Sequence, residues 1–210
     1  AQTSDVHKLI TNLLGETPLK EDLKELCDGI GGRPTGSIAN FKSIKWGLEK
    51  FQTAGVKVQK DAFRMPGLWL ENESSAKISG AVSFEPKVVA LTFSEGTHRS
   101  GIKANLLDGG RGLKDDFERL GEKAKGKFVL IETDELVDID GLFKEYADAV
   151  GIEDLAYNAG VKGIVYMSSR PMRLLYRHNA SRSFGNTLPM LVMAREDAKR
   201  RFRILGNNQS

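Results

Sequence analysis

Three short apolar runs in the second half of the chain constrain its fold more than any other feature. They are too short and too apolar to be surface helices. The three runs are "KFVLIET" at 127–133, "VKGIVYMS" at 161–168 and "LPMLVMA" at 188–194. Stretches with helical spacing lie before, between and after them, at 112–126, at 142–159 with a break expected near Gly151, and at 195–204. Strands that alternate with helices predict a sheet flanked by helices. The residues expected in adjacent buried strands are Val129, Ile131, Ile164, Val165, Leu191 and Val192.

In the first 55 residues, the apolar residues recur with the spacing of helices rather than as short continuous runs. Apolar residues recur at helical spacing over 3–16, 18–28 and 37–54, and Gly55 is expected to end the third helix as a left-handed cap. From Val56 the pattern alternates, so "VKVQKDAF" predicts a strand at 56–63. Further short strands are expected within 75–94 and at 101–108. The predicted class is α+β, with a helical N-terminal flank followed by a β-sheet core flanked by helices.

"GIGGRPTGS" at 29–37 packs four glycines and a proline between two predicted helices. A phosphate-binding loop and a plain corner are both compatible with such a stretch. As a corner, its glycines permit positive φ, Pro34 fixes φ and Ser37 caps the next helix. Arg33 would then bind backbone carbonyls. "DGGRG" at 108–112 also precedes a helix, but it lacks the spacing of a dinucleotide fingerprint and the Lys-Ser/Thr of a P-loop, so turn glycines are favoured.

The composition excludes several classes of protein. With 40% hydrophobic and 28% charged residues, the chain is typical of globular domains. No apolar run approaches the roughly 20 residues that span a bilayer, so no membrane partner is expected. The net charge of +3 is small and aromatics do not interleave with the basic residues, so no nucleic-acid partner is expected either.

Residue types that carry hydrolytic chemistry are sparse. The chain has three histidines and one cysteine, with no His-x-Asp phrase and no Glu-Glu pair. A hydrolytic metal site needs about three converging ligands, so we expect no cofactor held by this chain. Cys27 lies at helical spacing from Leu23 and Ile30, which predicts a buried apolar role rather than a nucleophile.

One long irregular stretch, 169–187, holds the candidate functional residues. It contains "LYRHN" at 175–179 and four arginines with no acidic residue, which gives a local positive potential. Such loops often reach a ligand, and arginine binds carboxylates in a bidentate fashion. The candidate substrate-binding residues are Tyr176, Arg177 and His178. The alternative is a loop held only by its own polar contacts.

The segment 26–70 resembles the N-terminal region of zinc exopeptidases of the plasma glutamate carboxypeptidase and aminopeptidase Y family. Members begin with Leu-x-x-x-Ile-Gly-x-Arg-x-x-Gly-Ser, then a helix, a strand and a Pro-x-x-Trp segment. The matching residues here are Leu26, Ile30, Gly31, Arg33, Gly36, Ser37, Pro66 and Trp69. The rest resembles the protease-associated domain inserted in that family, through "AKGKFVLIET", "AYNAGVKGIVYMSS" and "LPMLVMAREDAKR".

The resemblance implies a division into residues 1–65, a helical flank of the peptidase domain, 66–206, the protease-associated domain, and 207–210, a tail. In the family, the ligands of two zinc ions and a glutamate general base follow the inserted domain, and this chain ends before them. We therefore expect a non-catalytic portion of a zinc exopeptidase that covers or shapes the substrate cleft. The chain alone is expected to be inactive, with the two zinc ions in the parent enzyme.

The resemblance also implies partners and a location. The expected partners are the catalytic domain of the same polypeptide and a peptide substrate, with a homo-oligomer as a further possibility. The chain begins at Ala1 without a methionine, which suits removal of a signal peptide, and hence a secreted or periplasmic protein, or a trimmed product. Two other functions stay open: an independent peptide- or protein-binding module, and a nucleotide-binding α/β enzyme that would rest on "DGGRG".

Overall fold

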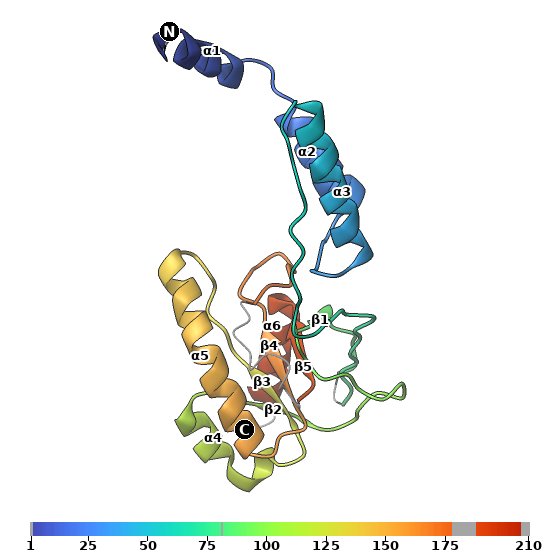
Figure 1. Cartoon of the computed structure of the whole chain (residues 1–210). Helices are drawn as coiled ribbons and strands as arrows, with labels where there is room; N and C mark the ends of the chain where they lie inside the picture. Colours follow the sequence, from blue (N-terminus) through green and yellow to red (C-terminus); the bar gives the residue numbers. More distant parts are fainter. Residues whose placement is uncertain (1, 81, 178–187, 207–210) are drawn as a thin grey trace. The chain divides into compact units, whose positions relative to one another are not determined.

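The computed structural model describes residues 2–80, 82–177 and 188–206 (Figure 1). The chain divides into two compact units, Ala1–Leu70 and Glu71–Ser210, and each is described by itself. Together they confirm the α+β class: a helical N-terminal unit is followed by a unit built on a β-sheet with helices on both faces. No helix among the described residues combines the length and the apolar character needed to cross a membrane.

The N-terminal unit is helical, as its periodicity predicts. Its elements are α1 (Gln2–Leu14), α2 (Leu19–Lys24), a π-helical turn at Glu25–Ile30 and α3 (Ile38–Thr53). Ser37 is the N-cap of α3, because its Oγ accepts a hydrogen bond from the Asn40 amide at 3.0 Å. Gly55 follows α3 with φ of +76°, the left-handed conformation predicted for a helix cap.

The stretch "GIGGRPTGS" is a corner held by the chain's own groups. One terminal guanidinium nitrogen of Arg33 donates to the carbonyls of Leu26 and Gly31, at 2.9 and 2.6 Å. Gly36 has φ of +83°, and a Cβ there would lie 2.6 Å from Cδ1 of Leu68. The positive φ favours glycine here, whereas the exposed Leu68 side chain could move aside. The corner interpretation is confirmed, including the carbonyl-binding role of Arg33.

Three local predictions for the N-terminal unit are wrong. The second helix continues past Gly29 as a π turn to Ile30, residues 56–63 form no strand, and Cys27 is exposed. The reasons are tertiary. No side chain described between residues 4 and 70 is buried, so Cys27 has no core to enter. An alternating segment becomes a strand only where another strand pairs with it, and 56–63 has none in the described structure.

The second unit is built on a five-stranded mixed sheet (Figure 1). In chain order its strands are β1 (Val88–Ala90), β2 (Leu106–Asp108), β3 (Phe128–Ile131), β4 (Gly163–Met167) and β5 (Met190–Met193). They lie in the order β1-β5-β4-β3-β2. Strands β2 to β5 are parallel, and β1 pairs antiparallel with β5 at the edge. The predicted adjacency of the three apolar runs is confirmed, and of the residues named for them only Leu191 is half-buried rather than buried.

Helices cover both faces of this sheet. The helices α4 (Lys114–Leu120), followed by a 3₁₀ turn at Gly121–Ala124, and α5 (Ile139–Asn158) supply Phe117 and Ile152 to the core on one face. On the other face, α6 (Arg195–Gly206) packs Ala198 and Phe202 against Leu130 and the two methionines that end β4 and β5. Helix α5 begins three residues before the predicted start and runs unbroken through Gly151.

Candidate functional site

A small pocket of about 70 Å³ lies at the carboxyl ends of the parallel strands. Arg111 follows β2, and the segment 131–136 ends and follows β3; both line the pocket together with side chains of α5 and Arg177. The carboxyl edge of a parallel sheet is where open α/β folds bind ligands. The lining residues from α5 are Gly141, Lys144, Glu145, Asp148 and Ile152, and Leu113 adds to them from the start of α4.

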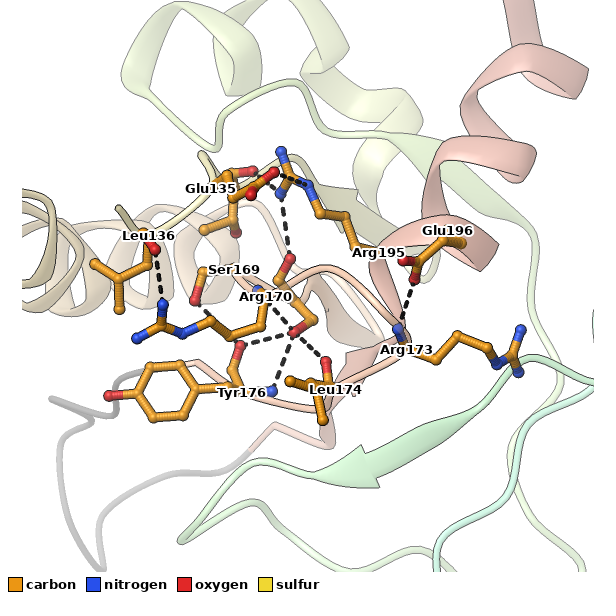
Figure 2. A network of polar contacts seen from close by, with 11 residues as sticks. Glu135, Leu136, Ser169, Arg170, Arg173, Leu174, Tyr176, Arg195 and Glu196 are labelled. Carbon is orange, nitrogen blue, oxygen red and sulfur yellow. Dashed lines mark hydrogen bonds and ion pairs between the residues drawn. The ribbon is translucent and has the colours of Figure 1, made fainter. Parts of the chain in front are cut away.

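The hydroxyl of Ser168, directly after β4, organises the loop that follows. It bonds the carbonyls of Leu174 and Tyr176 at 2.6 and 3.0 Å and accepts from the amides of Arg170 and Tyr176 at 3.2 and 3.0 Å. Ser169 adds bonds from its amide and its hydroxyl to the Tyr176 carbonyl (Figure 2). Both serines are fully buried. Their contacts fix the path of the loop up to Tyr176.

Three arginines around this loop are engaged with the protein itself (Figure 2). Arg170 donates to the Leu136 carbonyl at 2.8 Å and lies over the ring of Tyr176. Arg173 pairs with Asp197 at 2.8 Å. Arg195, at the start of α6, donates to the carbonyls of Thr133 and Ser168, which follow β3 and β4. Arg170 and Arg195 therefore join the loop to the segments that follow the strands, and Arg173 joins it to α6.

Arg177 lies between the pocket and the core. It donates to the hydroxyl of Thr133 at 2.7 Å, and its guanidinium is 4.0 Å from the ring centroid of Tyr166. Its Nε atom is buried and has no hydrogen-bond partner among the described residues. The Tyr166 hydroxyl is likewise buried without a partner in the described structure. Burial raises the pKa of Tyr166 far above the usual tyrosine range, and the nearby Glu153 adds to this while Arg177 opposes it.

An ion pair borders the pocket on the side of β2. Both terminal nitrogens of Arg111 bond the two carboxylate oxygens of Asp134, a bidentate arrangement. The hydrogen bond from Arg111 lowers the pKa of Asp134 and, in return, raises the pKa of Arg111. On α5, Lys144 bonds Asp148 at 2.9 Å. Much of the charge around the pocket is therefore already paired.

Of the predicted site residues that the structure describes, Arg177 lies at the pocket and Tyr176 does not. Tyr176 is partly exposed beside Arg170, and Arg177 lines the pocket. His178 lies outside the described residues. The alternative of a loop held by its own polar contacts describes Arg170 and Arg173 well. Arg177 differs from them because it borders the pocket and retains an unbonded donor within the described structure.

The turn "DGGRG" is filled by the chain's own carboxylates. The Gly110 amide bonds Asp108 at 2.8 Å, and the amides of Arg111 and Leu113 bond one oxygen of Asp116 at 3.0 and 3.2 Å. An incoming phosphate would need these same amides. The turn-glycine interpretation is confirmed, and the nucleotide-binding alternative loses the feature on which it rested.

Sequence reasoning missed Thr133, Ser168 and Arg195, which hold the loop in place. Each one directly follows a buried strand or lies within two residues of its end. Polar residues at the carboxyl ends of adjacent parallel strands meet at one edge of the sheet, and this signal could have identified them. Among the residues that the structure describes, no group of three His, Cys, Asp or Glu side chains could hold a metal ion.

Together, the fold and the pocket define an α+β unit with a small pocket at the carboxyl edge of its sheet. Solved structures with a similar fold are peptidases, and one of them is a zinc aminopeptidase. BSAP, a zinc aminopeptidase from Bacillus subtilis, matches with a TM-score of 0.62 and 22% identity over 86% of this chain and 39% of its own. A peptidase M28 precursor from Shewanella amazonensis matches with a TM-score of 0.75 and 20% identity over 90% of this chain and 43% of its own.

An aminopeptidase from Aneurinibacillus matches more weakly, with a TM-score of 0.51 and 17% identity. The chain thus spans about two fifths of the length of the solved structures it matches. No protein-family model and no curated protein matches the chain. At these identities, the likeness describes a shared fold.

Proposed function

We propose that the chain is the N-terminal, non-catalytic portion of a secreted or periplasmic zinc exopeptidase, with a protease-associated domain in its second unit. The observation that carries the proposal is the fold likeness to peptidases, among them a zinc aminopeptidase, over 86 to 90% of the chain. The phrases that resemble the exopeptidase family run along the same residues. The two zinc ions and the general base would belong to the remainder of the polypeptide.

The remainder of the polypeptide is also the proposed partner of the N-terminal unit. Helices α1 and α3 carry large apolar side chains that are exposed, among them Leu9, Leu13, Ile38 and Phe41. Exposed apolar faces of this kind mark surfaces that bind another part of a protein. In the proposed enzyme, the catalytic domain would cover them.

The loop with Tyr176 and Arg177 is proposed to face the peptide substrate. A guanidinium can bind a carboxylate through two N–H groups, and Arg177 is the residue of this loop that lines the pocket in the described structure. The bond to Thr133 and the contact with the Tyr166 ring hold this side chain in one orientation. A fixed arginine at the pocket would position a carboxylate of the substrate.

Arg177→Ala in the complete polypeptide tests this proposal. The chain joined to its catalytic portion is expected to hydrolyse peptides, while the chain alone is not. In the joined protein, Arg177→Ala should raise KM or lower kcat/KM by about tenfold or more. The matched control is Arg173→Ala, which removes an arginine of the same loop that bonds Asp197 instead.

Steady-state kinetics on a series of peptides measure the effect, and thermal unfolding checks that both variants are folded. Equal kinetics for the two variants at equal stability would contradict a substrate-binding role for Arg177. Peptide binding by the chain alone, without such a kinetic effect, would favour the independent binding module.

A further inference from the structure

The five-stranded sheet has two edge strands, β1 at one end of the strand order and β2 at the other. Every residue of these two strands is half-buried, whereas β4 in the centre is buried throughout. An edge strand presents N–H and C=O groups to which a strand of another chain can add. The groups that already bond these edges therefore decide how easily the sheet can extend into a second molecule.

On β1, a carboxylate from outside the sheet bonds the outward edge. The Leu91 amide bonds the Met190 carbonyl on the side of β5. Because successive residues of a strand direct their backbone groups to opposite sides, the amide of Ala90 points away from β5. Oε1 of Glu71 accepts a hydrogen bond from this amide at 2.9 Å. The outward amide of β1 is thus already engaged.

On β2, a guanidinium bonds the outward edge. The Asn105 carbonyl accepts from the Phe128 amide on β3, so the carbonyl of the next residue, Leu106, points away from β3. A terminal nitrogen of Arg201 on α6 donates to the Leu106 carbonyl at 3.3 Å. Burial lowers the pKa of Arg201, so the side chain makes this contact from a partly desolvated position.

We propose that Glu71 and Arg201 block the two edges of the sheet against strand pairing with a second copy of the chain. Each supplies the kind of group that an incoming strand would supply: an acceptor for an amide on β1 and a donor for a carbonyl on β2. An incoming strand must first displace the side chain. The displaced charge then lies beside the new strand and opposes its burial.

Glu71→Ala in the full chain tests the β1 edge. Because this variant frees the Ala90 amide, aggregation followed by light scattering and thioflavin T fluorescence should be about fivefold faster or more. Glu71→Gln keeps an acceptor oxygen and should aggregate at nearly the rate of the unchanged chain. Glu73→Ala removes the same charge from an exposed position two residues away and controls for net charge.

Arg201→Ala tests the β2 edge in the same way. Its matched control is Arg203→Ala, which removes the same charge from an exposed position on the same helix. Faster aggregation is expected for Arg201→Ala and not for Arg203→Ala. The two edges are separate, so Glu71→Ala and Arg201→Ala together should aggregate faster than either variant alone.

A loss of stability also speeds aggregation, so rates are compared at urea concentrations that give all variants the same free energy of unfolding. Hydrogen exchange of the aggregates then identifies the edge involved. In aggregates of Glu71→Ala, the peptide that contains β1 should exchange at least about tenfold more slowly than in the monomer. Equal rates for Glu71→Ala and Glu71→Gln at matched stability, or a β1 peptide that exchanges as in the monomer, would overturn the proposal.

Discussion

Several arginine side chains in the described structure bind the protein's own backbone. Arg33 donates to carbonyls at the corner before α3, Arg170 to the carbonyl of Leu136, and Arg195 to the carbonyls after β3 and β4. Carbonyls at the ends of helices and strands lack a ladder partner, and the guanidinium carries five N–H donors that can satisfy them. A cluster of arginines that resembles a ligand site in sequence is thus partly a set of structural contacts.

At the residue scale, we predict how removing the buried hydroxyl of Tyr166 changes the free energy of unfolding. Because it has no hydrogen-bond partner among the described residues, Tyr166→Phe should leave the free energy of unfolding unchanged or raise it by up to about 1 kcal/mol. The contact of Arg177 with the ring is retained in this variant. Chemical denaturation measures the difference. A loss of more than about 1 kcal/mol would mean that the hydroxyl has a partner outside the described residues.

The carbonyl contacts of Arg33 and the helix-capping role of Ser37 could be predicted from the local sequence, because their hydrogen-bond partners lie within seven residues. The contacts around the pocket could not be predicted in this way. The bond from Arg177 to Thr133 spans 44 residues, and the bond from Arg195 to the Thr133 carbonyl spans 62. Only the strand order brings these groups together, so the sequence indicated Tyr176 and Arg177 but not the residues that hold them.

At the level of elements, the buried strands are the best predicted part of the fold. Their short apolar runs are distinctive because parallel strands are covered on both faces. The strand expected at 56–63 shows the opposite case, since an alternating pattern does not by itself supply a neighbouring strand. Helix α5 begins at Ile139 because Asp138 caps it, its carboxylate accepting from the Gly141 amide at 2.8 Å. Its earlier start therefore depends on a cap that the apolar pattern did not reveal.

At the scale of elements, we predict how a substitution in the central strand β4 changes stability. Ile164 is fully buried between β3 and β5, so Ile164→Ala should cost about 2–5 kcal/mol of unfolding free energy. Val88→Ala on the half-buried edge strand β1 is the matched control and should cost less. Urea unfolding, followed by hydrogen exchange of peptides from β3 and β4, compares the two. A loss below about 1 kcal/mol for Ile164→Ala would contradict a central position for the strand.

Over the whole molecule, burial is distributed very unevenly. The second unit contains both apolar cores, whereas no described side chain between residues 4 and 70 is buried. A helix without a buried face depends on its own backbone bonds, and such helices are only marginally stable in water. We therefore expect the two units to differ in stability, with the N-terminal unit the less stable when the chain is alone.

Hydrogen exchange of the chain alone should report this difference. We expect amides in residues 1–64 either to exchange much faster than those in 67–204 or to become protected only as the chain self-associates. Exchange measured by mass spectrometry over a range of protein concentrations separates the two cases. Slow and uniform exchange in a chain that stays monomeric at high concentration would contradict the prediction.

The antiparallel pairing of β1 with β5 has a consequence for biosynthesis. Val88 pairs with Met193, so β1 leaves the ribosome about 100 residues before its partner does. At about 5–20 residues per second, β1 waits roughly 5–20 s with its hydrogen-bonding edge open to other chains. Strands β2, β3 and β4 can pair in order during that interval. The first strand of the sheet to be translated is therefore the one that must wait for the last, and during that interval the nascent chain is most exposed to aggregation.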